Sequence, residues 1–368
     1  MPYGNINVDT VTTGMAGGIL GAGNASIMKN RIINGAMVID QRNAGDSVTL
    51  DGSGIYAVDR FRGVNSTDGT ITGQQSSTAP TGFVNSVKYT ITAADTSLAG
   101  TQFASIDQFI EGYNIADLGW GTANAKTVTL SFWVYSSLTG TFGGALLNNA
   151  GDRSYPFSYT ISSANTWEYE TITIAGDTSG TWLTNNGRGI ALRFSLGTGS
   201  TYSGTAGAWA SALYLAPTGA TSVVGTNGAT FYITGVQLEV GSSATGFEYV
   251  NYQTSLANCQ RYFIKYGGDQ VYEHVASGMG IAGTQAQCDT SVPVPMRTTP
   301  SSSISTLALS DGVGSSISVT SANIQTSESS PRRTSITYIV ASGVTTYRPY
   351  NVNTNNSTSG FLALSAEL

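Results

Sequence analysis

Alternation of apolar and polar residues is the clearest signal in this chain, and residues 130–137 (LSFWVYSS) show it in a simple form. Leu130, Phe132 and Val134 share one face of an extended chain, because successive side chains of a strand point to opposite sides of a sheet. The pattern therefore predicts a strand with one buried face. Trp133 and Tyr135 fall on the second face, where three roles stay open: sandwich core, subunit interface or glycan contact.

Similar short alternating runs, separated by Gly, Asn, Asp and Ser, recur between residues 41 and 250. About eight strands at this spacing predict an all-β domain, an antiparallel jelly-roll β-sandwich of two sheets. The expected strands are 83–93, 102–111, 127–136, 140–147, 153–161, 167–174, 189–196 and 229–240.

The remaining sequence divides into three parts. Residues 1–40 are Gly-rich and irregular, with too little periodic apolar pattern for a core of their own. Residues 251–261 are expected to connect two domains through a short helix at 255–261, with Thr254 or Ser255 as its N-cap. Residues 262–368 return to strand patterns and predict a smaller β-sandwich domain.

The strands expected in this second domain are 262–266, 286–294, 302–308, 315–319, 335–341 and 360–366. Three prolines, Pro293, Pro295 and Pro300, fall within residues 292–300. Because proline cannot donate a backbone hydrogen bond to a ladder, this stretch is expected to be an edge strand or an extended loop.

Composition narrows the functional classes. Of 368 residues only 10% are charged, against roughly 25% in an average globular protein, and the formal net charge is −6. An acidic chain without clustered Lys and Arg is a poor partner for nucleic acid, whose phosphates require neutralisation. We expect neither membrane insertion nor an export signal, because no basic start or long apolar run is present. Cys259 and Cys288 are expected to be buried thiols.

Catalytic chemistry finds little support. Asp107 and Glu111 would lie too far apart along one strand for the usual glycosidase pair, and Glu168 and Glu170 are expected on a solvated face. His274 is the only histidine of the chain, which excludes a His-based metal cluster within one protomer. A single structural calcium ion in an Asp/Asn-rich loop is compatible with the composition, but its ligands stay unassigned and no other cofactor is expected.

Several long stretches resemble a known family. Residues 29–45 (KNRIINGAMVIDQRNAG) and 56–61 (YAVDRF) resemble the N-terminal signature of phage tail-fibre-like proteins in phages of aquatic bacteria, including cyanobacteria. The stretches that resemble the carbohydrate-binding-module-like jelly roll of the same proteins are 108–142, 151–182 and 230–249. The small C-terminal β domain of that family is resembled by residues 259–263, 292–301 and 362–368.

The resemblance implies a non-enzymatic homotrimeric tail fibre that recognises a host-surface glycan, assembled in the bacterial cytoplasm and later extracellular on the virion. It implies that residues 1–40 attach to other tail or baseplate proteins, with candidates Asn30, Arg31, Ile32, Ile33 and Asn34. It also implies that the domain over residues 262–368 is the distal tip. A structural head-fibre or decoration protein and a glycan depolymerase are the alternatives.

The glycan-binding hypothesis rests on aromatic residues, because sugars stack their C–H faces on Trp and Tyr and bind nearby polar groups. We expect Trp167 in the core, whereas Trp120 and Trp182, beside glycines, are expected in exposed loops. In the C-terminal domain the recognition candidates lie together in residues 345–360. The glycan-contact candidates are Trp120, Trp133, Tyr135, Trp182, Tyr347, Arg348 and Tyr350.

Overall fold

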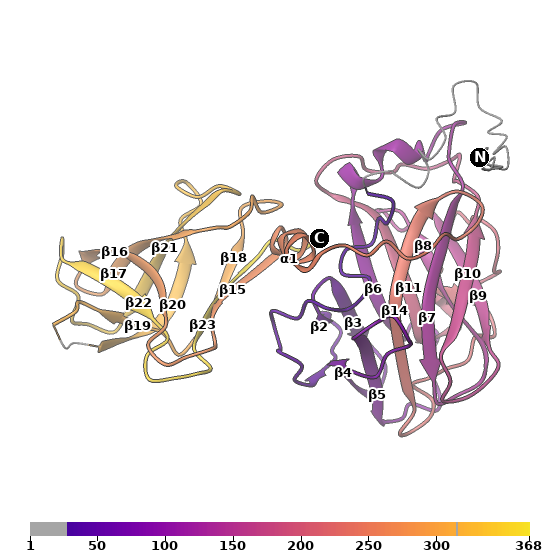
Figure 1. Ribbon diagram of the computed structural model, residues 1–368, viewed down its shortest axis with the longest axis horizontal. Helices are drawn as coiled ribbons and strands as arrows, with labels where there is room; N and C mark the ends of the chain where they lie inside the picture. The colour runs from indigo at the N-terminus through magenta and orange to yellow at the C-terminus, as the bar shows by residue number, and fades with distance from the viewer. Residues whose placement is uncertain (1–27, 314–315) are drawn as a thin grey trace, which may run out of the picture.

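The computed structural model describes residues 28–313 and 316–368, and it consists of two β domains on either side of a short helix (Figure 1). The first domain runs from β1 to β14 and the second from β15 to β23. Between them lies α1 (Tyr252–Gln260). The predicted all-β class is therefore confirmed.

The first domain is a sandwich of two antiparallel six-stranded sheets within the described residues. Sheet A has the order β1 (Val48–Thr49), β4 (Thr70–Ser76), β5 (Ser86–Ala93), β14 (Thr230–Val240), β7 (Val128–Ser136) and β10 (Glu168–Ile174). Sheet B has the order β2 (Ile55–Val58), β3 (Phe61–Asn65), β6 (Phe103–Glu111), β11 (Arg188–Thr198), β8 (Gly140–Leu147) and β9 (Ser154–Ile161). Short elements complete it: η1 (Gly112–Asn114), η2 (Ala116–Leu118), η3 (Ser200–Tyr202), β12 (Ser203–Gly204) and β13 (Ala216–Pro217).

The core lies between the two sheets, and β7 shows how the alternation places it. Leu130, Phe132 and Val134 are fully buried, and the Phe132 ring packs against Phe194 of sheet B with ring centroids 4.9 Å apart. Burial of such side chains stabilises the fold by about 1.5–3 kcal/mol each. Trp133 and Tyr135 point to the opposite side of sheet A, away from the core, and are half-buried.

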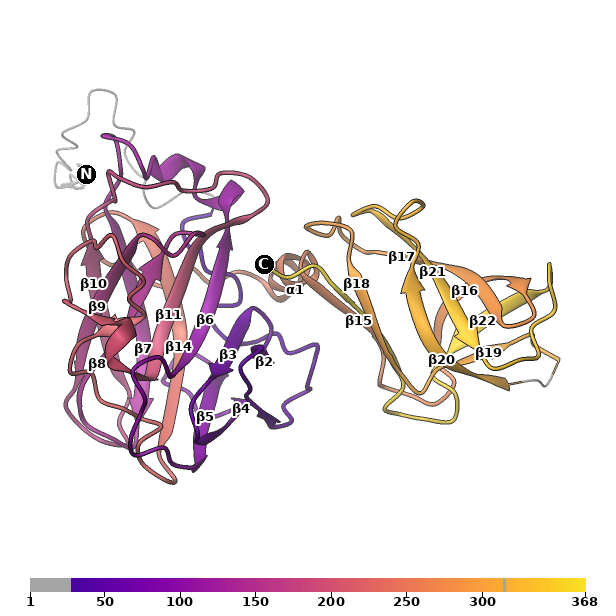
Figure 2. The ribbon, with the colours of Figure 1, turned by 180° about the vertical axis from the view of Figure 1, so that it is seen from behind.

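The second domain is a β domain as predicted, but it combines a barrel with a separate sheet and is not the expected smaller β-sandwich. Within the described residues, six strands close into a barrel in the order β16 (His274–Ala282), β17 (Gln285–Ser291), β21 (Arg333–Val340), β20 (Ser316–Ile324), β19 (Ala308–Ser310) and β22 (Pro349–Asn353). A three-stranded sheet has the order β15 (Phe263–Gly267), β23 (Phe361–Ser365) and β18 (Ser301–Ser305). This sheet lies between the barrel and the sandwich (Figure 2).

Most predicted strands are confirmed within two or three residues, among them all eight expected in the sandwich. The run expected at 302–308 is instead two strands, β18 and β19, divided at Thr306, which has a φ of +48°. Residues 292–300 form no strand and follow β17 as an extended loop, in agreement with their prolines.

The predicted N-cap of the connecting helix is wrong. Helix α1 begins three residues earlier, and the side chain of Asn251 accepts a hydrogen bond from the Thr254 backbone N–H at 2.9 Å. Asn251 has an extended backbone with ψ 154°, the geometry of an N-cap, and Asn is among the best residues for it.

The candidate virion-attachment residues pack against the sandwich rather than forming part of a separate segment. The Arg31 backbone N–H donates to Leu238 O of β14, and the Ile33 N–H donates to Gln108 of β6. Three of the five candidates are buried: Arg31, Ile32 and Asn34. The whole set, Asn30, Arg31, Ile32, Ile33 and Asn34, lines a cavity of about 1040 Å³ beside α1. Residues 1–27 of the expected attachment segment lie outside the described residues.

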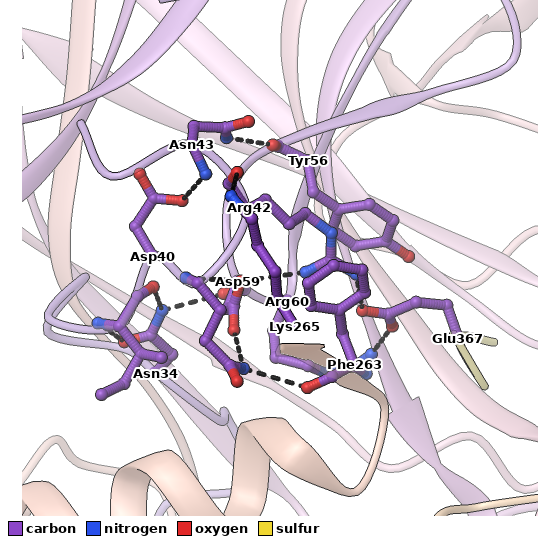
Figure 3. Close-up of polar contacts among 12 residues, drawn as sticks. Asn34, Asp40, Arg42, Asn43, Tyr56, Asp59, Arg60, Phe263, Lys265 and Glu367 are labelled. Atoms are coloured by element: carbon purple, nitrogen blue, oxygen red, sulfur yellow. Dashed lines mark hydrogen bonds and ion pairs between the residues drawn. The ribbon is translucent and has the colours of Figure 1, made fainter. Parts of the chain in front are cut away.

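A buried polar network, here called the junction, joins the two domains (Figure 3). Arg42 contacts Asp59 at 2.9 Å and Glu367 of the C-terminal segment at 2.8 Å, and its guanidinium lies 3.6 Å from the ring centroid of Phe263. Arg60 also pairs with Glu367. The charges of the sandwich are thus paired with a charge of the second domain.

A second set of contacts extends the junction towards α1. The Glu111 carboxylate accepts from Arg261 Nε at 2.8 Å and from the Tyr262 hydroxyl at 2.7 Å. The Arg60 guanidinium lies 3.6 Å from the ring centroid of Tyr262. These contacts link the sandwich to the end of α1 and to the start of the second domain.

Candidate functional site

The outer face of sheet A carries a group of aromatic side chains, here called the aromatic face. Cross-strand register brings its members together: Tyr169 of β10 pairs with Trp133, and Tyr232 of β14 pairs with Tyr135. Their ring centroids lie 5.3 and 5.0 Å apart. Trp167 completes it, 5.5 Å from Tyr135, and is half-buried here rather than in the core as expected. The members are Trp133, Tyr135, Trp167, Tyr169 and Tyr232.

A groove of about 440 Å³ lies beside Trp133, here called the aromatic groove. Trp133 and Tyr169 form one part of its lining, and Phe83 and Tyr249 form another. The segment 241–249 turns back over sheet A, where Thr129 Oγ1 donates to Gly241 O at 2.9 Å. Residues 244–247 of this segment, like Tyr249, also line the groove.

Gly235 at the groove is required by geometry. It lies in a β-bulge of β14, where the register with β7 shifts between Thr234 and Gln237. Its φ is +61°, and a Cβ atom there would lie 2.7 Å from Phe83 Cζ and 3.1 Å from Trp133 Cδ1. A larger residue would therefore push Phe83 and Trp133 apart and reshape the groove.

Polar atoms at the groove are available to a ligand. Within the described residues, Trp133 Nε1, the Tyr169 hydroxyl and Thr81 Oγ1 have no protein hydrogen-bond partner, and Tyr169 and Thr81 are exposed residues. Tyr169 is 44% exposed. Flat rings with free polar edges are the combination that a sugar requires, since its C–H faces are apolar and its hydroxyls need hydrogen bonds.

Trp120 and Trp182 are not exposed, which corrects the expectation for both. They form a cluster with Trp209, with ring centroids 4.7–5.4 Å apart in edge-to-face geometry. Each indole N–H donates to a backbone carbonyl: Trp120 to Lys126, Trp182 to Ser179 and Trp209 to Ala175. A tryptophan whose ring and N–H are both engaged fixes loops and has nothing left to offer a ligand.

The three candidates of the C-terminal domain differ in exposure and in hydrogen-bond or ion-pair partners. Tyr347 is 84% exposed, with a φ of +66°. Arg348 pairs with Asp311 at 2.8 Å. Tyr350 is buried in the barrel core, and its hydroxyl accepts a hydrogen bond from the Thr345 N–H at 3.0 Å, which contradicts a role in surface recognition. Only Tyr347 of these three presents a ring to solvent.

The carboxylates considered for catalysis have structural partners. Asp107 and Glu111 are buried in ion pairs with arginines. Glu168 accepts hydrogen bonds from the backbone N–H groups of Ser162 and Ser163. Glu168 and Glu170 are half-buried on the core side of β10, because Tyr169, and not they, occupies its outer face, so the expected solvated face is wrong. Burial and the nearby Glu168 raise the pKa of Glu170.

The remaining chemistry-bearing residues are unremarkable in their surroundings. Cys259 and Cys288 are buried free thiols, as predicted, and burial raises the pKa of Cys288 to about 12. His274 is exposed. Within residues 28–313 and 316–368, no group of three His, Cys, Asp or Glu side chains is placed to hold a metal ion. The same residues include no helix that is long and apolar enough to cross a membrane.

Comparisons with known proteins found no matching family model and no matching curated protein. Among solved structures, the enzymatically active domain of bacteriophage CBA120 tailspike protein 4 aligns with 12% identity and a TM-score of 0.31, over 58% of this chain and 22% of that one. A family 11 carbohydrate-binding module of Clostridium thermocellum aligns with 12% identity and a TM-score of 0.26, over 55% of this chain and 99% of that module. Similarity at this level assigns no residue and no function.

Proposed function

We propose that this protein binds a cell-surface glycan through the aromatic groove, as a non-enzymatic, trimeric fibre protein of a phage virion. One observation carries the binding proposal: the rings of Trp133 and Tyr169 line the groove side by side, and the polar atoms of both side chains have no protein partner within the described residues. The fibre setting, the trimer and the attachment to tail or baseplate proteins rest on the sequence resemblance. The partner is accordingly a host glycan, and no cofactor takes part.

A glycan array probed with the full chain tests this proposal. We expect wild-type protein to bind a subset of glycans, and Trp133→Ala to weaken that binding by about fivefold or more, because a stacked ring contributes on the order of 1 kcal/mol or more. Tyr347→Ala removes an exposed ring of the other domain and serves as the matched control. It is expected to bind like the wild type.

Three outcomes would reject part or all of the proposal. Absence of binding by folded wild-type protein rejects glycan recognition. Loss of binding in Tyr347→Ala but not in Trp133→Ala places recognition in the C-terminal domain. If Trp133→Ala instead changes the oligomeric state in light scattering, the aromatic face is a subunit interface, as the structural head-fibre alternative requires.

A further inference from the structure

The outer face of sheet B, opposite to the aromatic face, carries two arginines that contact one buried carboxylate, and a third arginine lies nearby. Cross-strand register places Arg62 of β3 and Arg193 of β11 on either side of Asp107 of β6. Both arginines contact the same oxygen, Asp107 Oδ2, at 3.0 and 3.3 Å. Their guanidinium groups therefore lie side by side.

Arg188, at the start of β11, adds a third positive charge. Its guanidinium carbon lies 4.8 Å from the ring centroid of Phe109, and that of Arg62 lies 4.7 Å from the same ring. Burial, followed by the neighbouring charges of Arg193 and Arg62, lowers the pKa of Arg188. Here the term arginine cluster denotes Arg62, Arg188 and Arg193 together with Asp107.

The three positive charges of the arginine cluster exceed the single negative charge of Asp107. Asp107 is fully buried, and its second oxygen already accepts a hydrogen bond from Ser105 Oγ at 2.8 Å. Within the described residues, the Nε atoms of the three arginines are buried without a hydrogen-bond partner. One terminal nitrogen of each also has no protein partner there, because Arg62 bonds only Asp107, Arg193 only Asp107 and Arg188 only Asn149 O.

We infer that the arginine cluster is a second ligand site, which takes a carboxylate or sulfate group of an acidic polysaccharide. Planar guanidinium groups match the paired oxygens of these anions, and the terminal nitrogens without a protein partner supply the donors. An extended polyphosphate is a poorer fit, because the excess charge is confined to one point in a chain of net charge −6. The site is on another face from the aromatic groove and does not depend on it.

Affinity electrophoresis of the full chain tests this inference, with polygalacturonate, dextran sulfate and neutral dextran in the gels. Retardation by one or both acidic polymers, and not by neutral dextran, is expected, and comparison of the two acidic gels separates carboxylate from sulfate. Arg188→Gln is the main variant, because it leaves both contacts of Asp107 in place. It should weaken retardation by about five- to tenfold, and Arg188→Lys should restore part of it.

Arg332→Gln is the matched control, since it removes an equal charge from an exposed position of the C-terminal domain. Equal losses in Arg332→Gln and Arg188→Gln would reduce the effect to net charge and overturn the inference. So would the absence of retardation by either acidic polymer, or an Arg188→Gln variant with a lower melting temperature and unchanged binding. Trp133→Ala should bind acidic polymers normally, so failure of the aromatic groove and failure of this site are distinguishable.

Discussion

The junction and the aromatic face differ in how completely the polar atoms of their large side chains are hydrogen-bonded within the protein. Arg60 is 2% exposed, pairs with Glu367, donates to Phe109 O and lies over the ring of Tyr262. Trp133 is half-buried, and its indole N–H has no protein partner within the described residues. Over the same residues, both terminal nitrogens of Arg60 have protein partners, although its Nε is buried without one, whereas the indole N–H of Trp133 has none.

The difference gives a criterion that separates structural from ligand-binding aromatic and charged residues in this protein. Trp120 and Trp182 meet the structural description, because their rings and N–H groups are both engaged. The arginine cluster meets the ligand-binding description, because one terminal nitrogen of each of its arginines has no protein partner within the described residues, whereas both terminal nitrogens of Arg60 have one. If the criterion holds, substitutions at the junction should change stability, and substitutions at the two ligand sites should change binding.

The largest effect is expected at the junction. Arg60→Ala should lower the free energy of unfolding by about 3–5 kcal/mol, because it leaves the Glu367 charge without one partner in a buried setting. Urea unfolding followed by fluorescence measures this loss. Arg332→Ala, at an exposed position, should change stability by less than about 0.5 kcal/mol. A loss below about 1 kcal/mol for Arg60→Ala would show that the junction does not hold the two domains together.

A pH-dependent contribution to stability is expected next, at Asp59. Burial raises the pKa of Asp59 from 3.8 to about 6, with Arg42 and Gln41 opposing the rise and Glu367 and Asp40 adding to it. The folded protein therefore holds this proton more tightly than the unfolded chain does. The contribution of Asp59 to stability should fall as pH rises from about 4 to 6, by at most about 3 kcal/mol, and stay constant above that.

Asp59→Asn isolates this contribution, since it removes the titrating group and leaves the other carboxylates in place. Unfolding free energies of both proteins, measured from pH 4 to 8, should differ by an amount that changes between pH 4 and 6 and is flat above. A difference that is constant over the whole range would mean that Asp59 titrates alike in both states. An opposite slope would mean that Arg42 outweighs burial.

The strands were largely predictable from the sequence, because alternation is a local property. The eight sandwich runs found by pattern are strands, with the core on the predicted face of β7. The strands β1 to β4, β12, β13, β16 and β22 were missed. In β16, Gly278 and Gly280 interrupt the pattern. Gly278 is needed there by a distant neighbour: a Cβ atom at this position would lie 1.9 Å from Gln287 O of β17. Such a requirement comes from packing and leaves no local signal.

The candidate site was only partly predictable, for the same reason. Trp133 and Tyr135 were found, but Tyr169 was not, although it follows Trp167 at the spacing of one strand face. A register for β7 and β10 would have found it, because Tyr169 lies opposite Trp133. The arginine cluster comes from β3 and β11, far apart in sequence, so no local pattern indicates it. Glycine neighbours suggested exposure for Trp120 and Trp182, where the glycines instead allow tight loops.

A smaller effect on stability is expected on the aromatic face. Tyr169→Ala should cost less than about 1 kcal/mol in unfolding free energy, since the side chain is 44% exposed and lies on an edge strand. It should nevertheless weaken glycan binding by about threefold or more in the array. Tyr113→Ala, 61% exposed and remote from the groove lining, is the control and should leave binding unchanged. A large stability loss with intact binding would place Tyr169 among the structural residues.

The smallest effect is expected for added salt on binding at the aromatic groove. Binding of a neutral glycan at the aromatic groove depends on ring contacts and neutral hydrogen bonds, so its affinity should change by less than about twofold between 50 and 500 mM NaCl. Retardation by acidic polymers at the arginine cluster should fall steeply over the same range, because salt screens the attraction between the charged polymer and the guanidinium groups. Isothermal titration and gel retardation measure the two. Parallel losses at both sites would mean that the aromatic groove also binds through charge, and the division between the two faces would fail.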